Sequence, residues 1–489
     1  MSNQEKQLFS RRHVFVAGAG GMTVMLSAAC GGAATPSPTP ERPPPTSTTA
    51  PVVVQPTVVQ PTVTQPTVAP AKPSPAGPPA VPTNAPSPVP PQSKGPAAVG
   101  SPDYSAHVFL WGSFETTQRD LGLVRDMGFT WVKQMLEWRY IEPHVKGKYE
   151  WNEPDRIMDA VARANLKMIA RIDNQPKWTR ADATWPTPGP PDKLSDFGDF
   201  INDLSKRYKG RIQAYQIWNE PNLSREWGEQ PPNPVQYTAM LKIAYQAIKA
   251  NDPDAYVISG GLSPTTASGK QAMPHVEFAK ALYAAGAKPY FDMLGVHAAG
   301  FKAPPETSPD DIAKNPAYNH GEGAAGRIYG FRNAEDMRAV MVANGDAAKK
   351  VAILEFGWTS DPRPTSPYNW HAVSEGEKAT YLVGAFEYAK KNWQPWIGPM
   401  NVIYISDPNW NKENEQYYWS ITDPDGKPRP AYSALKAMNK GNIAPSSNTA
   451  PASKPGASAP AAVAPATTPA VSATVSAAAK PTVAGATKP

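Results

Sequence analysis

Two hydrophobic patterns alternate along the middle of the chain, between residues 104 and 440. Short apolar runs typical of buried strands are separated by segments whose apolar residues return every three or four positions, as on one face of a helix. The predicted strands are 108–111, 130–135, 167–172, 212–217, 255–259, 291–297, 351–355 and 402–405. The predicted helices are 118–127, 155–164, 193–208, 235–250, 276–285, 334–343, 375–391 and 431–438. Eight strand–helix units in succession predict an α/β fold, a (β/α)8 TIM barrel rather than an open doubly wound sheet.

Two of the predicted strands end in a glutamate. The sequence Ile-Trp-Asn-Glu-Pro-Asn at 217–222 places Glu220 after the fourth strand, and Pro221 keeps it out of helical geometry. Glu355 ends the seventh strand. Barrel enzymes hold their catalytic groups at these strand ends, and two carboxylates suit a pair that meets across one sugar bond. The alternative for 219–222 alone is ordinary turn chemistry, since Asn and Pro both favour turns.

Composition separates the barrel from the rest of the chain. Most of the 58 prolines lie before residue 103 or after residue 444, whereas all 14 tryptophans lie between Trp111 and Trp419. We therefore predict a globular domain at 104–440, long enough for a barrel of about 250 residues with insertions. The net charge of +6 falls entirely outside this domain, in which basic and acidic residues balance. A domain without a basic face is not expected to bind nucleic acid.

Residues 1–30 resemble an export signal. Ser-Arg-Arg-His-Val-Phe at 10–15 is similar to a twin-arginine motif, and the apolar stretch that follows is too short and glycine-rich for a membrane span. Cys30, the only cysteine, follows Ser-Ala-Ala as in a bacterial lipoprotein cleavage site, where the cysteine is lipidated. Ordinary cleavage near the same bond is the alternative. In either case we expect an exported protein, extracellular or at the cell surface. With Cys30 lipidated, we expect this anchor to be its only contact with the membrane.

Residues 31–103 and 441–489 are rich in Pro, Ala, Thr and Ser, and Gln-Pro-Thr-Val recurs at 55, 60 and 65. This composition cannot pack a core and predicts disordered segments on both sides of the barrel. At about 3.1 Å per residue, some 65 residues of extended linker would reach on the order of 200 Å, which would make the first segment a stalk. We expect the second segment to be a spacer or a wall-embedded tail.

Three further motifs complete a family resemblance. They are Trp-Arg-Tyr-Ile-Glu-Pro at 138–143, Gly-Lys-Tyr-Glu-Trp at 147–151 and Asp-Pro-Asp-Gly-Lys-Pro-Arg-Pro-Ala-Tyr at 423–432. With glutamates after strands four and seven, the core resembles the clan A retaining glycoside hydrolases over essentially its whole length. Within this clan it is most similar to glycoside hydrolase family 39, with family 5, which includes cellulases, as the near alternative.

The resemblance implies a role for each glutamate. Glu220 would be the acid/base that protonates the leaving oxygen, and Glu355 the nucleophile about 5 to 5.5 Å away. Two carboxylates so close cannot both ionise freely, so we expect the pKa of Glu220 to be raised. Asn219 is expected to hydrogen-bond the sugar 2-hydroxyl, as its counterpart in the family does.

His297, at the end of the sixth strand, is similar to a histidine that many clan members place near the nucleophile. An ordinary hydrogen-bonded histidine is the alternative. The family often has a tyrosine two residues further on, where this chain has Ala299. The donor that contacts Glu355 is therefore open, with Tyr318 and Tyr329 of the polar insertion at 298–329 as candidates.

Aromatic side chains that follow or end predicted strands are candidates for stacking on sugar rings at the barrel mouth. They are Trp178, Trp358, Tyr404, Trp410 and Trp419. Taken singly, each is better explained by core or rim packing. The seven histidines show no HExxH or comparable ligand spacing, so we expect neither a metal nor a cofactor.

These features predict a monomeric glycoside hydrolase that retains anomeric configuration and acts on an extracellular β-linked polysaccharide or oligosaccharide. Two alternatives use the same barrel: a non-catalytic carbohydrate-binding surface lipoprotein, and a transglycosylase that passes the sugar to another sugar. The sequence leaves the sugar, its linkage and endo or exo attack undetermined.

Overall fold

The computed structural model describes residues 95–181 and 185–441. The predicted signal peptide, Cys30, nearly all of the linker and the C-terminal tail lie outside these residues. The described residues as far as Asn439 belong to one compact unit, and Lys440 begins a second.

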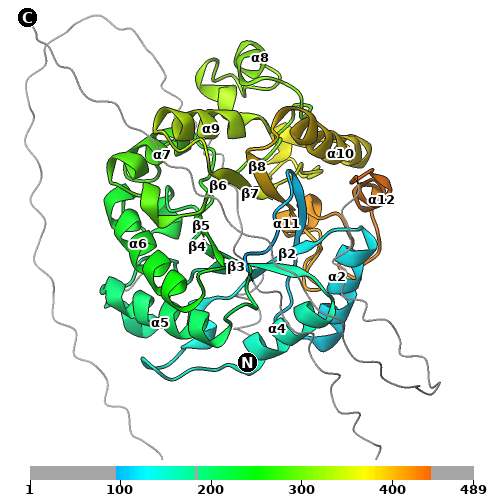
Figure 1. Cartoon of the computed structure of the whole chain (residues 1–489). Coiled ribbons are helices and arrows are strands. Elements are labelled where there is room, and N and C mark those ends of the chain that lie inside the picture. Colours follow the sequence, from blue (N-terminus) through cyan, green and yellow to red (C-terminus); the bar gives the residue numbers. More distant parts are fainter. Residues whose placement is uncertain (1–94, 182–184, 442–489) are drawn as a thin grey trace, which may run out of the picture. The chain divides into compact units, whose positions relative to one another are not determined.

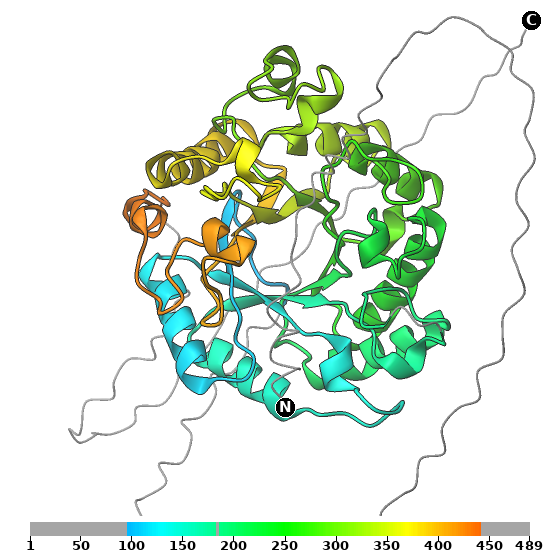
Figure 2. The same ribbon diagram turned by 180° about the vertical axis from the view of Figure 1, so that it is seen from behind.

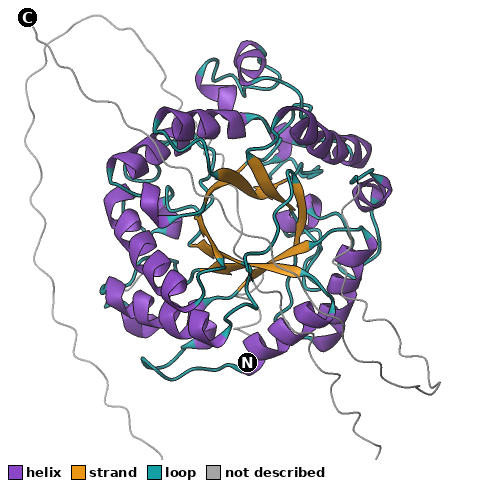
Figure 3. Ribbon diagram, in the orientation of Figure 1, coloured by secondary structure: helices purple, strands orange, loops and turns teal. Residues whose placement is uncertain are grey.

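Eight parallel strands form a closed barrel in which each strand pairs with the next along the chain, and helices surround it on the outside (Figures 1 and 3). Pairing of β1 with β8, for example Ser105 opposite Asn401, closes the ring. The strands are β1 Asp103–His107, β2 Trp131–Met135, β3 Lys167–Ile172, β4 Ala214–Ile217, β5 Tyr256–Ser259, β6 Met293–His297, β7 Lys350–Phe356 and β8 Ile397–Val402. The predicted (β/α)8 barrel is thus confirmed.

The helices follow the strands in the order that the hydrophobic pattern predicts, and the opposite view shows the same surrounding ring (Figure 2). Their bounds are α2 Phe114–Asp126, α3 Trp138–Ile141, α4 Asn152–Arg163, α5 Leu194–Arg207, α6 Pro234–Asn251, α7 His275–Ala284, α8 Pro309–Lys314, α9 Asn333–Ala343, α10 Glu375–Asn392, α11 Glu415–Trp419 and α12 Pro430–Ala437. Short 3-10 helices are η1 Lys177–Thr179, η2 Ser224–Glu226, η3 Lys288–Tyr290, η4 Ala325–Ile328 and η5 Asn369–His371. The polar insertion predicted after β6 contains α8 and η4.

The first and eighth strands are not where the apolar runs predict them. β1 ends just before 108–111, and β8 ends at Val402, the first residue of 402–405. β1 begins with Asp103, whose carboxylate is satisfied by Trp131 Nε1 at 2.8 Å and Thr130 Oγ1 at 2.9 Å, so a polar residue is accommodated in a buried strand. β8 contains Gly398 and Pro399, two residue types with low strand propensity, so the sequence pattern does not predict a strand there.

Inside the barrel, apolar side chains fill the end nearer the amino termini of the strands, and polar side chains lie nearer the carboxyl ends. Trp131, Ile169 and Ala214 belong to a buried cluster inside the barrel. Side chains two residues further along a strand lie on the same face. Lys133 and Arg171 therefore also face the interior, one layer closer to the carboxyl ends of the strands, and both are buried. This polar layer is the floor of the site described below.

Candidate active site

The chain segment after β4 has an uncommon backbone. Trp218 has φ of 68° and Glu220 has φ of 39°, both in the left-handed region that non-glycine residues seldom adopt. The segment is held by the Trp218 indole, whose Nε1 donates to the carbonyl of Glu226 at 2.7 Å, and by the Glu220 amide, which donates to the carbonyl of Gly261 at 3.0 Å. The surrounding contacts thus fix the direction of the Glu220 side chain.

Two cationic or potentially cationic groups contact the Glu220 carboxylate. Nη2 of Arg225, on η2, lies 2.6 Å from Oε2, and Nδ1 of His297, at the end of β6, lies 3.0 Å from Oε1. The Glu220 side chain is only 5% exposed, whereas that of Arg225 is 27% exposed. The carboxylate is therefore buried, and its guanidinium partner reaches solvent.

A second set of cations surrounds the Glu355 carboxylate on β7. Nζ of Lys133, on β2, lies 2.8 Å from Oε1, and Nη1 of Arg171, on β3, lies 3.6 Å from the same oxygen. The Lys133 side chain is fully buried and that of Glu355 is 4% exposed. Lys133 also donates to the carbonyl of Leu354 at 3.0 Å, which fixes the ammonium beside the carboxylate.

His297 joins the two glutamates. Its Nε2 lies 3.9 Å from Oε1 of Glu355, while its Nδ1 contacts Glu220. A single imidazole ring therefore touches both carboxylates, from opposite sides. The ring can occupy this place because Gly261 has no side chain: a Cβ on that residue would lie 2.2 Å from Cδ2 of His297. The structure thus brings together the three residues Glu220, Glu355 and His297, which the sequence singles out.

Both glutamates have lowered pKa values. Burial raises the pKa of Glu355, but the charges of Lys133, His297 and Arg171 outweigh it and lower the pKa to about 2. Burial likewise raises the pKa of Glu220, but the hydrogen bond with His297 and the charge of Arg225 lower it to about 2. The expected raised pKa of Glu220 is therefore wrong for this structure, because the sequence does not show that His297 and Arg225 contact this carboxylate.

A third carboxyl group lies beside this pair. Oε1 of Glu226 is 3.7 Å from Nε of Arg225, the residue that pairs with Glu220. Burial raises the pKa of Glu226 to about 8; the charge of Arg225 opposes this and that of Glu220 adds to it. At neutral pH Glu226 therefore holds a proton next to the Glu220–Arg225 pair.

Asn219 lies between the two residues with positive φ, beside Glu220. It is buried, and its Oδ1 accepts from Nε2 of Gln216 at 3.4 Å. The amide nitrogen of the Gln216 side chain also donates to the carbonyl of Trp218 at 3.0 Å. Gln216 therefore orients the amide that the sequence predicts as a sugar contact.

Most of the predicted stacking residues surround the barrel mouth. Tyr404, Trp410 and Trp419 belong to one buried, largely aromatic group, the mouth cluster, which also contains Ala299, Phe301, Ala303, Ile312, Ile328, Tyr329, Tyr368 and Ile403. Trp178 is partly buried, and its Nε1 donates to the carbonyl of Glu142 at 2.8 Å.

The prediction for Trp358 is wrong. Its side chain is 0% exposed within the main core, and its Nε1 donates to the carbonyl of Ala303 at 3.0 Å. A Cβ on Gly300 would lie 1.8 Å from the Trp358 ring, which shows how closely the backbone covers it. An indole enclosed in this way has no face for a sugar.

The insertion does not supply the donor to Glu355 as predicted. The Tyr329 hydroxyl contacts Glu322 at 2.9 Å and Thr266 at 3.3 Å, and Tyr318 packs against the mouth cluster. The donor is Lys133, and Arg171 adds an ion pair at 3.6 Å; sequence reasoning missed both. A charged residue within each of two predicted interior strands was the signal that could have identified them.

In the part of the chain that the structure describes, no three His, Cys, Asp or Glu side chains are grouped so as to hold a metal ion. Within the same residues, every helix is too short or too polar to span a bilayer.

Comparison with known proteins supports the sequence resemblance over part of the chain. Residues 92–290 match the sequence model of the cellulase family, glycosyl hydrolase family 5. This segment contains Asn219 and Glu220 but not Glu355. Comparison with curated proteins found no match.

Many solved structures match the chain. One is a family 39 glycoside hydrolase from Bacteroides cellulosilyticus WH2, with 19% identity, a TM-score of 0.48, and coverage of 69% of this chain and 63% of that chain. Another is a glucosidase from Croceicoccus marinus, with 14% identity, a TM-score of 0.49, and coverage of 70% and 68%. A third is xylanase 10B from Thermotoga petrophila RKU-1 with xylobiose, with 14% identity, a TM-score of 0.45, and coverage of 69% and 93%.

The first of these structures extends well beyond the matched region, because this chain spans less than two thirds of its length. The family match includes the Glu220 motif and strands β1 to β5 of the closed barrel.

Proposed function

We propose that the protein hydrolyses O-glycosidic bonds in a β-linked polysaccharide or oligosaccharide with retention of anomeric configuration. Glu355 is the nucleophile and Glu220 the acid/base. The observation that carries this proposal is the shared contact with His297, which places the two carboxylates on either side of one imidazole ring. Paired carboxylates from two strand ends are what double displacement at a sugar requires.

In the first step, a carboxylate oxygen of Glu355 forms a bond to the anomeric carbon as the bond from that carbon to the leaving oxygen breaks. The leaving oxygen takes a proton from Glu220. In the second step, Glu220 removes a proton from water, the water oxygen attacks the anomeric carbon and Glu355 leaves. The pKa of Glu355, about 2, keeps it ionised and ready to attack at neutral pH.

Glu220 must gain a proton before the first step. With a pKa of about 2 it is ionised in this structure, and the charge of Arg225 contributes to that. Separation of Arg225 from Glu220 as a sugar enters would raise the Glu220 pKa, because burial then acts with less opposing charge. The exposed part of the Arg225 side chain gives it room to move towards solvent.

The remaining roles concern the sugar. Asn219 donates to the 2-hydroxyl, a contact that strengthens in the transition state. His297 fixes the spacing of the two carboxylates. Trp178, which is only partly buried, offers a ring face on which the apolar face of a further sugar unit stacks, whereas Tyr404, Trp410 and Trp419 are each 5% exposed or less and pack in the mouth cluster.

We further propose that the enzyme is a monomer that works outside the cytoplasm. The twin-arginine-like signal at 10–15 directs export, and Cys30 carries the lipid that holds the protein at the cell surface. The Pro-rich residues 31–103 then act as a stalk that lets the barrel reach a polymer too large to import.

Hydrolysis of chromogenic β-glycosides and of a panel of β-linked polysaccharides tests this function. We expect the wild-type chain to release product and Glu355→Ala to lose activity by several orders of magnitude. Glu277→Ala, which removes an exposed glutamate paired with Lys280, is the matched control and is expected to keep full activity. Equal rates for wild type and Glu355→Ala on every substrate would refute the enzymatic function.

Carbohydrate binding without hydrolysis is the second candidate function. The ion pair between Arg225 and Glu220 favours it, because an acid that stays ionised cannot protonate a leaving group. The two functions differ in one result. A pure binding protein would be slowed by a polysaccharide in the gel during affinity electrophoresis, yet would leave that polysaccharide uncut after prolonged incubation.

A further inference from the structure

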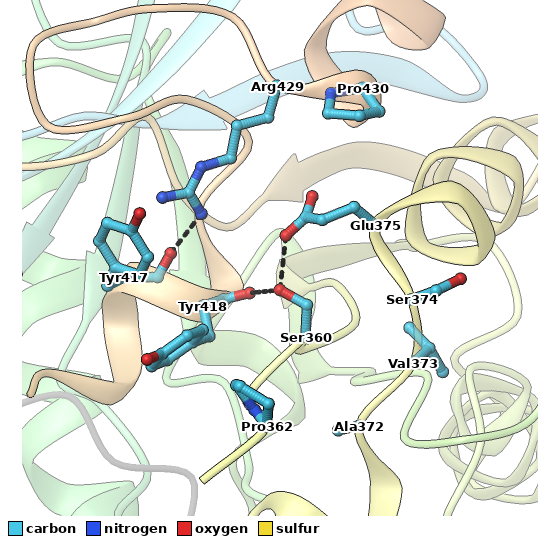
Figure 4. Close-up of a pocket in the computed structure, with 10 residues that line it drawn as sticks. All are labelled: Ser360, Pro362, Ala372, Val373, Ser374, Glu375, Tyr417, Tyr418, Arg429 and Pro430. Atoms are coloured by element: carbon cyan, nitrogen blue, oxygen red, sulfur yellow. Dashed lines mark hydrogen bonds between the residues drawn. The ribbon is translucent and has the colours of Figure 1, made fainter. Parts of the chain in front are cut away.

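One cavity has neither glutamate on its lining. It has a volume of about 550 Å³, opens to solvent, and is bordered by the loop after β7, the start of α10, helix α11 and the start of α12 (Figure 4). Its walls include Pro362, Ala372, Tyr417 and Tyr418, and none of the predicted stacking residues. Trp419, on the same helix as the two tyrosines, belongs instead to the mouth cluster. The lining of the cavity therefore shares no residue with the candidate active site.

Arg429 provides a donor that the protein leaves unused. Its side chain is more than nine-tenths buried, with Nε donating to Asp423 at 2.9 Å and Nη1 donating to the carbonyls of Tyr417 at 2.5 Å and Ser420 at 3.3 Å. Its Nη2 is buried and has no hydrogen-bond partner among the described residues. A buried donor without a partner is costly unless a ligand or water supplies an acceptor.

Glu375, across the cavity from Arg429 in Figure 4, provides the matching acceptor. Its Oε1 accepts from the Ser360 hydroxyl at 2.5 Å and lies 3.4 Å from Nζ of Lys378. Its Oε2 is buried and unpaired within the described part of the chain. One wall thus offers a hydrogen-bond donor and the other an acceptor.

The rest of the lining is largely apolar and aromatic. The guanidinium of Arg429 lies over the Tyr417 ring at 4.1 Å, and that of Arg363 lies over the Tyr418 ring at 5.0 Å, so both rings are held in place. The one cation and one carboxylate on the lining give the cavity no net charge. A suitable occupant is therefore neutral, has apolar ring faces, and carries groups that both donate and accept hydrogen bonds.

From this combination we infer that the cavity is a second, non-catalytic binding site for a neutral sugar, of about the size of a disaccharide. Hydroxyl groups donate to Glu375 and accept from Arg429, and a ring face packs against the tyrosines and Pro362. Pockets of 300 to 1,000 Å³ with apolar walls and a few converging polar groups are typical of small-molecule sites. The cavity would hold one segment of a glycan while another part occupies the barrel mouth.

Methyl NMR of the full chain tests this inference, because Val373 lines the cavity and its methyl signals report occupancy. The probe is cellobiose with a sulfur atom in place of the linking oxygen, which resists hydrolysis. We expect the Val373 signals to shift with saturation. We expect Ala372→Trp, which fills the cavity without removing a hydrogen bond, to weaken this response at least tenfold. Ala348→Trp, at an exposed alanine before β7, is the matched control and is expected to respond like wild type.

Each other outcome overturns the inference. Val373 signals that do not move with thio-linked cellobiose or thio-linked xylobiose would show a cavity occupied by water only. An equal shift in Ala372→Trp would place the response elsewhere. A larger response to glucuronic acid or glucosamine than to the neutral sugars would contradict the charge argument. Neither glutamate lines the cavity, and Ala372→Trp is expected to hydrolyse small chromogenic substrates at the wild-type rate, so loss of hydrolysis in Glu355→Ala is a separate result.

Discussion

At the scale of single residues, the site depends on where the positive charges lie. Lys133 and Arg171 are buried beside Glu355, and Arg225 lies at the surface side of Glu220. Buried cations cannot leave, so they keep the nucleophile ionised until it attacks and stabilise its carboxylate again when it leaves in the second step. A partly exposed cation can be displaced, which suits a group that has to gain and lose a proton.

Replacement of Lys133 by methionine tests the role of the buried cation. Without the ammonium, the pKa of Glu355 rises, so the acid limb of the kcat/KM profile moves up by about 1 to 3 pH units. Lys378→Met is the matched control, because Lys378 is another fully buried lysine whose pKa burial lowers to about 8, and it donates to the carbonyls of Tyr418 and Ser420 and not to a catalytic glutamate. A profile of Lys133→Met that overlays that of Lys378→Met would contradict the assignment.

Replacement of Arg225 by alanine tests the role of the exposed cation. Loss of the guanidinium raises the pKa of Glu220, so the acid/base stays protonated to higher pH and the alkaline limb of kcat/KM moves upward by about 1 unit or more. Arg225→Lys keeps a charge and should move the limb less. Arg211→Ala removes a surface arginine paired with Asp159 and should leave it in place. An alkaline limb that moves to lower pH in Arg225→Ala would show that Arg225 does not oppose protonation of Glu220.

Sequence reasoning found the glutamates and His297 because each ends a strand, a position that a hydrophobic pattern marks. It missed Arg225, which lies on a 3-10 helix outside any periodic segment, and it missed Lys133 and Arg171, which it treated as parts of strands. Contacts between residues on different strands depend on how the barrel closes. The low pKa of Glu220 follows from those contacts, so the sequence could not predict it.

At the scale of elements, the hydrophobic pattern of the sequence and the observed strands disagree where β1 pairs with β8, the seam at which the barrel closes. The predictions for β3 and β7 agree closely with the structure because their apolar runs coincide with the paired residues. At the seam, β1 and β8 pair through Ser105 and Asn401, whose side chains hydrogen-bond to each other at 2.7 Å. The more apolar runs that follow both strands belong to the loops at the mouth, where they pack in the core and the mouth cluster.

The loop after β5 offers a prediction at this scale. Gly261→Ala would place a Cβ 2.2 Å from the ring of His297, so the ring must shift away from the glutamates. We expect kcat to fall at least tenfold with little change in fold by circular dichroism. Gly122→Ala, on α2, has open space at the new Cβ and is the control; it should keep its activity and gain up to about 1 kcal/mol of stability. Unchanged kcat in Gly261→Ala would show that the position of His297 does not matter.

At the scale of the whole molecule, the two buried glutamates link the free energy of unfolding to pH. Their folded pKa values, about 2, lie below the ordinary value of 4.5. Each therefore contributes stability that is fully present above about pH 4.5 and is lost as the pH falls towards 2. Urea unfolding of wild type and Glu355→Gln from pH 6 to pH 2.5 should show a smaller loss in the variant. An equal loss in both proteins would show that Glu355 is not held ionised.

The most direct test of the central claim, that Glu355 is the nucleophile opposite Glu220, is azide rescue of Glu355→Gly. With a dinitrophenyl β-glycoside, whose leaving group needs no acid, azide should occupy the space left by the carboxylate and attack the anomeric carbon. Proton NMR of the product is then expected to show the α-glycosyl azide, with inverted configuration. Formation of the β-glycosyl azide by Glu355→Gly would contradict the account. So would rescue by azide of Glu220→Gly without rescue of Glu355→Gly.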